Sequence, residues 1–267
     1  MLLGTLSLIG ASSVKPSIAG GSFQGPLVRV GPGADITIEN LTITGAAGTV
    51  SPNQGIGIEC PSTPSGTRHL RLVDVGVVSN QWDGVKAVRC SVDVTRSIFA
   101  TNGNSGLAIT DGSGTIERSL THHNTGTGFL LDVGVYTIRN CFSYMNTGPG
   151  MDIYGNQGTI GEFNTVADNT GGGLLCGVPN IAYANNLIFR NGTNSSSSCT
   201  YPGSLITDDP TGLNFVGANG GPTNYHINAG SLAIDAAQTS ATLDIDYDGD
   251  VRPQGAGRDV GADEFKP

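Results

Sequence analysis

The chain has 267 residues, a net charge of −9 at pH 7 and 41 glycines, which is about twice the usual glycine share of ~7%. Hydrophobic residues make up 37% of the sequence, so the chain can bury a core and is not a disordered polyelectrolyte. Thirteen basic residues on an acidic chain argue against nucleic-acid binding. The sequence contains no run of 18 apolar residues, so no membrane-spanning helix is predicted.

The N-terminal segment, residues 1–13, is apolar but has no positively charged leader, because Lys15 follows the apolar run. Leu6 and Leu8 alternate with Thr5 and Ser7, as in a first β-strand. We expect a strand left by trimming of a longer precursor, so that the export signal of an extracellular or cell-surface protein lies outside this sequence.

A repeat of about 22 residues organises the middle of the chain. A glycine follows four residues after each of the first five repeated asparagines, and a short apolar strand follows each glycine. The asparagines are Asn80, Asn102, Asn124, Asn146, Asn169 and Asn191, and the glycines are Gly84, Gly106, Gly128, Gly150 and Gly173. Residues 36–44 and 57–60 are typical of earlier turns of the same repeat.

This repeat predicts an all-β fold, a right-handed parallel β-helix solenoid with ~22-residue turns. We expect the asparagines to adopt left-handed corner geometry and to hydrogen-bond along the axis, and the glycines to allow sharp turns. The prediction is one domain over residues 1–267, with N-terminal turns at 1–35, regular coils at 36–200, and a final turn and C-terminal cap at 201–267.

The Asn/Gly repeat resembles the parallel β-helix repeats of pectate-lyase-like proteins. The C-terminal segments 231–237, 246–255 and 258–264 are similar to the end of bacterial choice-of-anchor Q proteins, which are surface or secreted proteins. Both resemblances imply a fold and a location, and neither names a reaction.

Outward positions on the strands after the glycines carry the first candidate site. The repeat places Asp132 beside Tyr154 on adjacent turns, and Asp152 one turn and two residues from Asp132, at about 8 Å. Two carboxylates at about 6.5–9.5 Å are typical of inverting glycosidases, so this trio predicts a polysaccharide hydrolase. The alternative is that these residues only keep an exposed strand soluble.

Glu59 and Lys86 are predicted neighbours on the same face, and Arg89 follows closely. Lys86 is therefore the candidate base of a polysaccharide lyase, a reaction that also needs a cation beside the uronate carboxylate. The alternative is a surface ion pair between Glu59 and Lys86.

Asp244, Asp246 and Asp248 match the first half of a calcium loop, in which alternate carboxylates converge before a glycine. The glutamate of a complete EF-hand loop is absent, since position 255 is glycine, but Asp259, Asp263 or Glu264 is a candidate to complete a different cage. The alternative is ion pairing with Arg252 and Arg258 in a C-terminal cap. No cofactor is required by either interpretation.

The five cysteines show no paired pattern, and Cys60 and Cys176 lie at predicted core positions. Cys176 and Cys199 are one turn apart, which makes them a candidate disulfide. The adjacent His122 and His123 are expected to point to opposite sides of an extended chain, so no zinc site is predicted.

Two functions from different classes follow. The first is a secreted or cell-surface protein that binds or processes a polysaccharide or cell-surface glycan along the exposed strand face. The second is a non-catalytic, adhesin-like surface module, which the low aromatic content of 6% favours because sugar platforms usually need aromatic rings.

Overall fold

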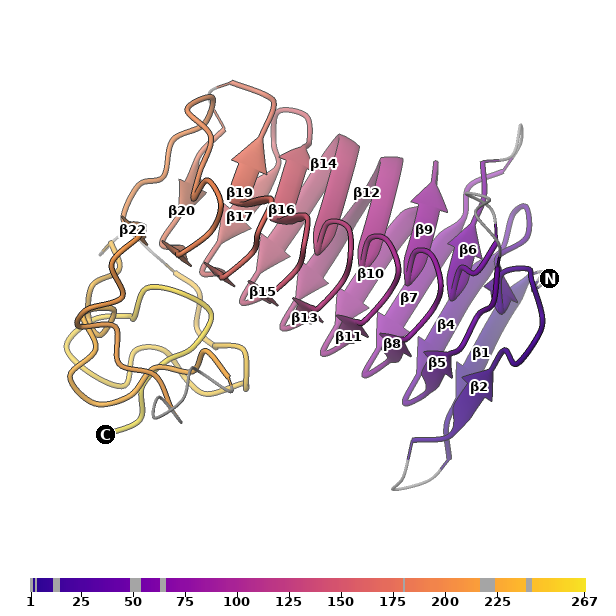
Figure 1. Ribbon diagram of the computed structural model, residues 1–267, viewed down its shortest axis with the longest axis horizontal. Helices are drawn as coiled ribbons and strands as arrows, with labels where there is room; N and C mark the ends of the chain where they lie inside the picture. The colour runs from indigo at the N-terminus through magenta and orange to yellow at the C-terminus, as the bar shows by residue number, and fades with distance from the viewer. Residues whose placement is uncertain are drawn as a thin grey trace.

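The computed structural model describes residues 2, 4–11, 15–48, 54–62, 66–179, 181–216, 224–238 and 242–267. Over these residues it contains twenty-two strands and no helix, hence none that would cross a membrane. Neighbouring strands run parallel. In the central coils each residue pairs with one 22 or 23 positions further on, as Val85 does with Leu107, whereas the spacing is wider in the N-terminal coils, as between Asp35 and His69. The coils stack into an elongated solenoid with the termini at opposite ends, which confirms the predicted parallel β-helix (Figure 1).

Each regular coil has three faces, which we call A, B and C. Face A carries the outward residues Glu59, Lys86, Leu130 and Asp152. It consists of β3 (Val28–Arg29), β6 (Ile58–Cys60), β9 (Val85–Val88), residues 107–110 of β12 (Leu107–Glu117), residues 129–132 of β14 (Phe129–Arg139), β16 (Pro149–Tyr154) and β19 (Gly172–Cys176).

Face B continues from face A around a corner, because the long strands β12 and β14 belong to both faces. It consists of β1 (Thr5–Ile9), β4 (Asp35–Glu39), β7 (His69–Val73), β10 (Ser91–Thr95), residues 113–117 of β12, residues 135–139 of β14, β17 (Ile160–Glu162) and β20 (Tyr183–Ala184).

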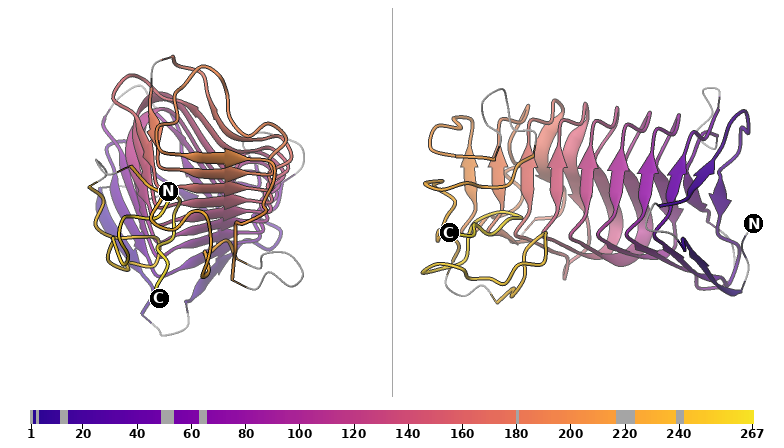
Figure 2. Two further views of the ribbon diagram at one scale, coloured as in Figure 1. Left: turned by 90° about the vertical axis from the view of Figure 1, so that its left-hand side faces the viewer. Right: turned by 90° about the horizontal axis from the view of Figure 1, so that it is seen from below.

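Face C is a separate sheet, and Figure 2 shows its strands as a regular ladder along the solenoid. It consists of β2 (Ser17–Ala19), β5 (Thr42–Thr44), β8 (Gly76–Val78), β11 (Ile98–Ala100), β13 (Leu120–His122), β15 (Phe142–Tyr144), β18 (Thr165–Ala167), β21 (Leu187–Phe189) and β22 (Leu205–Thr207).

The repeated asparagines point into the solenoid and form the predicted hydrogen-bonded ladder. Asn102 donates its backbone N–H and its Nδ2 to Oδ1 of Asn124, both at 3.0 Å, and the pattern continues from Asn124 to Asn146. The prediction that the asparagines are left-handed is wrong. The positive φ belongs to the residue before each of them, for example Thr101 at 54°.

The glycines that follow the asparagines provide room for this ladder. Gly106 has no positive φ, but a Cβ there would lie 2.9 Å from Nδ2 of Asn124 and 2.9 Å from the Gly128 carbonyl oxygen. Both distances are shorter than ordinary contacts, so the close approach of the next coil explains the glycine.

A second ladder of side-chain hydrogen bonds lies at the corner between faces B and C, where serine and asparagine occupy equivalent positions and the sequence repeat is harder to recognise. The side-chain oxygen of Ser97 accepts the N–H of Val75, and that of Ser119 accepts the N–H of Ser97, each at 3.1 Å. Further along, Asn164 donates to Asn186 in the manner of the first ladder. The buried corners are therefore satisfied by side chains from the adjacent coil.

The C-terminal cap, of which the structure describes residues 208–216, 224–238 and 242–267, packs against the outer surface of face C near the C-terminal end (Figures 1 and 2). Within the cap, buried Arg252 forms an ion pair with Glu264 at 3.2 Å. A second hydrophobic cluster joins cap and sheet, and its buried members are Phe142, Ala167, Leu187, Phe189, Leu213, Phe215, Tyr225, Ile227, Ala233, Val260 and Ala262.

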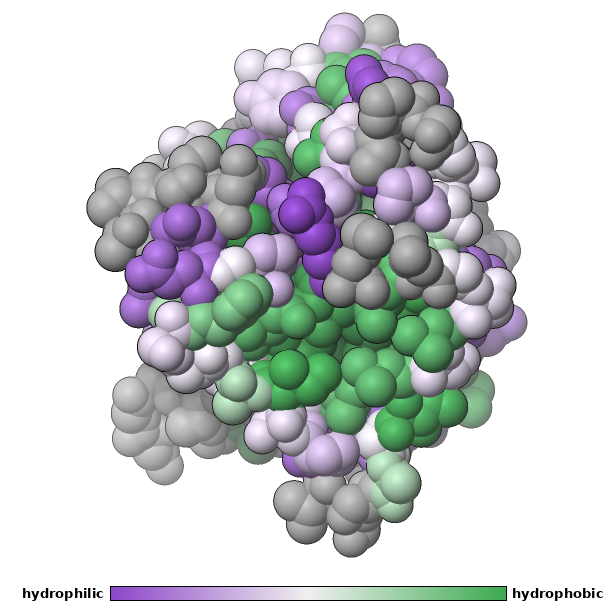
Figure 3. Space-filling model, turned by 90° about the vertical axis from the view of Figure 1, so that its right-hand side faces the viewer, coloured by the Kyte–Doolittle hydropathy of each residue, from purple (hydrophilic) through white to green (hydrophobic). Residues whose placement is uncertain are grey.

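The N-terminal end of the solenoid is open. Leu6 pairs with Ile36 and occupies the same inward column, yet Leu6 is 39% exposed while Ile36 is fully buried. The space-filling view from this end accordingly shows apolar surface at the centre (Figure 3).

Candidate functional site

The outer surface of face A brings the predicted hydrolytic residues together. Asp132 pairs in register with Tyr154, and Asp152 lies between Leu130 and Leu175 on the coils before and after it. The backbone at the end of the face-A part of β14 is held by the buried Tyr136, whose hydroxyl donates to the Asp132 carbonyl oxygen at 2.9 Å. These side chains therefore stand on rigid, paired strands.

Asp152 is the electrostatically unusual member of this group. Burial raises the pKa of its carboxyl to about 6, and the nearby negative charge of Asp132 contributes in the same direction. Its Oδ1 is buried and has no hydrogen-bond partner. A half-buried carboxyl between two leucines keeps its proton to higher pH than an exposed one, which suits a general acid.

Tyr154 supplies an aromatic ring beside the two carboxyls. The ring lies against Gly177 of the next coil, because a Cβ at Gly177 would collide with it, and the residue remains 46% exposed. An aromatic ring with a free face is a surface on which a sugar ring can stack.

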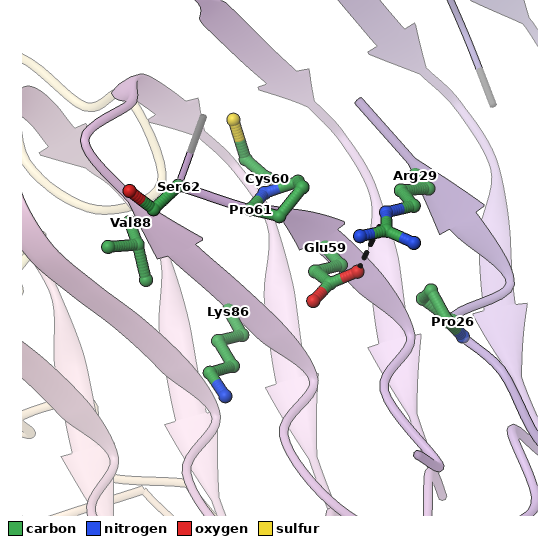
Figure 4. A pocket seen from close by; sticks show the side chains of 8 residues that line it. All are labelled: Pro26, Arg29, Glu59, Cys60, Pro61, Ser62, Lys86 and Val88. Atoms are coloured by element: carbon green, nitrogen blue, oxygen red, sulfur yellow. Dashed lines mark ion pairs between the residues drawn. The ribbon is translucent and has the colours of Figure 1, made fainter. Parts of the chain in front are cut away.

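Nearer the N-terminal end, face A contains an open hollow of about 430 Å³ (Figure 4). Glu59 is buried in it and pairs with Arg29 at 3.2 Å, and Lys86 lies beside Glu59 on the next coil. Lys86 thus lies where the sequence placed it.

The prediction that Arg89 joins Glu59 and Lys86 on this face was wrong. Arg89 lies at the corner after β9, where its Nε pairs with Oδ2 of Asp111 at 2.7 Å. Arg29 takes that place instead, and sequence reasoning missed it because Arg29 and Glu59 are 30 positions apart rather than 22.

The predicted calcium residues divide between two environments. Asp244 pairs with Arg258 at 3.1 Å, whereas the carboxylates of Asp246, Asp248 and Asp250 lie within 4.8 Å of one another. Both oxygens of Asp246 already accept backbone N–H groups, from residues 249, 250 and 264.

The cysteines form two disulfides in the structure. Cys176–Cys199 confirms the predicted pair. Cys60–Cys90 was not expected, since the sequence showed no paired pattern, but β6 and the corner after β9 bring the two Cα atoms within 6.4 Å.

The expectation for the adjacent histidines was also wrong. His123 has a φ of 54°, so the chain is not extended there, and the two rings approach with Nδ1 atoms 2.8 Å apart. Burial and the neighbouring His123 both lower the pKa of His122.

Comparisons with known proteins agree with this architecture. No curated protein matches the chain. Among solved structures, the crystal structure of pectate lyase Pel9A superposes with a TM-score of 0.55 at 14% sequence identity, over 90% of this chain and 69% of that one. This likeness shows a common fold, while the resemblance to choice-of-anchor Q proteins stays a prediction.

The family model described as "Right handed beta helix region" matches residues 28–229. The chain belongs to this right-handed β-helix family.

Proposed function

We propose that this protein is secreted or displayed at a cell surface and hydrolyses a polysaccharide bound along face A. The observation that carries the proposal is the pair of carboxyls on adjacent coils, in which Asp152 has its pKa raised to about 6 beside Asp132. The two disulfides support the location, because disulfides persist in oxidising compartments outside the cytosol. The pectate-lyase-like fold supports a polysaccharide as the substrate class.

Each carboxyl has a defined role. Protonated Asp152 donates its proton to the glycosidic oxygen as the bond from this oxygen to the anomeric carbon breaks. Ionised Asp132 accepts a proton from a water molecule, whose oxygen bonds to the anomeric carbon from the opposite side. One coil and two residues separate the two aspartates by about 8 Å, which leaves room for that water and predicts inversion at the anomeric carbon.

Tyr154 holds a sugar ring beside the carboxyls by stacking. A lyase reaction with Lys86 as the base is the second candidate, and the hollow around Glu59 and Lys86 favours it.

The experiment compares Asp152→Asn and Asp132→Asn with the wild type on a panel of neutral and acidic polysaccharides. We expect each variant to lose at least about a hundredfold in kcat, because each removes a proton-transfer group. Asp93→Asn makes the same chemical change on face B and should retain activity. Undiminished turnover in either face-A variant would overturn the hydrolase, and loss only in Lys86→Ala, with unsaturated products, would establish the lyase.

The pH profile gives an independent readout. Because the acid must be protonated, wild-type kcat should fall as pH rises above about 6, the pKa of Asp152. Tyr154→Ala should weaken glycan binding while the pH profile keeps its shape. If no glycan in the panel binds the wild type, polysaccharide recognition along face A is wrong.

A further inference from the structure

Arg68 is a buried arginine whose hydrogen-bonding capacity is largely unused. It lies directly before β7, at the corner between faces A and B, and is 3% exposed. Its Nη2 donates to the carbonyl oxygens of Val88 and Arg89, at 3.4 and 3.1 Å. Its Nε and Nη1 are buried without a hydrogen-bond partner. An unsatisfied buried guanidinium is unfavourable unless an acceptor completes it.

The contrast with Arg252 shows what is missing. Arg252 is also buried, but it pairs with Glu264 at 3.2 Å and donates to the carbonyl oxygens of Asp259 and Gly261. Arg68 has no carboxylate at ion-pair distance in the part of the chain that the structure describes. Buried charges in proteins are normally paired, so the position of Arg68 calls for an external anion.

Space for such an anion lies at the same corner of the solenoid. Arg68 lines an open hollow of about 330 Å³ at this corner. The register explains the hollow, because the positions that follow Arg68 in the same column are Cys90, Gly112 and Gly134, all small. Cys90 is held by its disulfide to Cys60, which fixes one wall.

The charge and hydroxyl groups of the lining favour an oxyanion. Arg89 and Asp111, which also line the hollow, pair with each other at 2.7 Å. Among the described residues of the lining, the positive charge of Arg68 is therefore not balanced by a carboxylate. Thr67, Ser91 and Ser113 also line this space, and because the Ser113 hydroxyl donates to the Ser91 oxygen at 3.4 Å, the hydroxyls of Thr67 and Ser91 are the ones that can donate to an oxyanion. A guanidinium fork with adjacent hydroxyls is the arrangement that binds carboxylate, sulfate or phosphate oxygens.

We propose that this corner hollow binds an oxyanion through the guanidinium of Arg68. The site is separate from Asp132 and Asp152, so it does not depend on the hydrolytic proposal. The oxyanion is either a free ion or a sulfate or uronate group carried by a glycan.

The first experiment measures the melting temperature of the full chain in sodium sulfate, sodium phosphate and sodium chloride at matched ionic strength. We expect sulfate and phosphate to raise the melting temperature of the wild type above its value in chloride. Arg68→Met should reduce this difference to the general stabilisation that sulfate and phosphate give a folded protein, and should weaken sulfate binding by about tenfold or more through loss of a charged donor. Arg71→Met removes an exposed arginine from β7, the strand that follows Arg68, and should retain the full effect.

Arg68→Lys keeps the charge without the fork and should bind sulfate with an affinity between those of the wild type and Arg68→Met. This variant also keeps the test decisive if Arg68→Met does not fold. Equal shifts in sulfate and chloride for the wild type, or equal sulfate binding by the wild type and both Arg68 variants, would overturn the proposal.

The second experiment identifies the source of the oxyanion by calorimetry with sulfated, uronate-containing and neutral oligosaccharides. Tighter binding of one acidic oligosaccharide than of inorganic sulfate, with competition between the two, assigns the site to a glycan group. Binding of inorganic sulfate alone assigns it to a free ion. Binding of a neutral oligosaccharide that Arg68→Met leaves unchanged, with no binding of any anion, contradicts the site.

Discussion

Face A and face C enclose the same interior, but their outward residues differ in chemical character and in what they contact. On face C the outward residues change along the solenoid, from Thr42 and Thr44 on β5 to Phe142 on β15 and Phe189 on β21. The C-terminal cap covers this apolar part. On face A the outward residues are mixed, and Tyr154 and the half-buried Asp152 are left accessible among the described residues.

Inward and outward residues of the same repeat have different roles. The inward residues and the asparagine ladder determine the solenoid, whereas the outward residues determine what each face contacts. Face C uses its outward residues for stability, because they bury apolar surface against the cap. On face A, the carboxyl of Asp152 lies between two leucines that do not stabilise its negative charge, and catalytic sites often contain carboxyls in such surroundings.

The largest expected difference between the faces is in the effect of truncating an outward apolar residue. Phe189→Ala should lower the free energy of unfolding by about 3–5 kcal/mol, because it leaves a cavity between sheet and cap. Leu130→Ala, on face A, should cost about 1 kcal/mol or less because Leu130 is only half-buried. Chemical denaturation measures both, and equal losses would contradict the distinction between the two faces.

A smaller effect is expected at Asp152. Its folded-state pKa of about 6 lies above the ordinary value of 3.8, so its contribution to stability is present at low pH and is lost as pH rises through 6. Asp152→Asn, which does not titrate, should therefore be more stable than the wild type at pH 8, by about 1–3 kcal/mol because solvent reduces the cost of the charge on a half-buried group, and nearly equal to it at pH 4. Denaturation midpoints at the two pH values measure this, and a less stable variant at pH 8 would show that the carboxylate supports the fold.

The smallest effect is expected from removing calcium from the cap. Asp246 is satisfied by three backbone N–H groups, and Asp250 pairs with Lys266 at 2.6 Å, so protein groups already hold this loop. A chelator should leave the melting temperature of the protein unchanged. A clear decrease, reversed by added calcium, would instead assign a structural calcium ion to Asp246, Asp248 and Asp250.

The regular coils could be predicted because their residues repeat. A single sequence shows two columns of Asn and Gly at one spacing, and this spacing determines which side chains are neighbours. That is why Asp132, Asp152 and Tyr154 were placed together, and why Cys176 could be paired with Cys199.

Contacts outside the repeat could not be predicted in the same way. Arg29 reaches Glu59 across a coil of 30 residues, and Cys60 reaches Cys90, three positions beyond its strand partner Ala87, across a coil of 27 residues. The docking of the cap onto face C depends on long-range packing. A signal for it was present in the sequence, namely the apolar outward residues Phe142 and Phe189, which have no reason to face water.

The asparagine ladder also has a direction. From Asn80 onward each side-chain amide donates toward the C-terminal end and accepts from the N-terminal side, until Asn191 donates to Asn194. Amide dipoles aligned head to tail polarise one another, so each bond is strengthened by those on either side. The coils are therefore coupled electrostatically as well as by packing, and an aspartate in the middle of this row would interrupt the coupling because an ionised carboxylate accepts but does not donate.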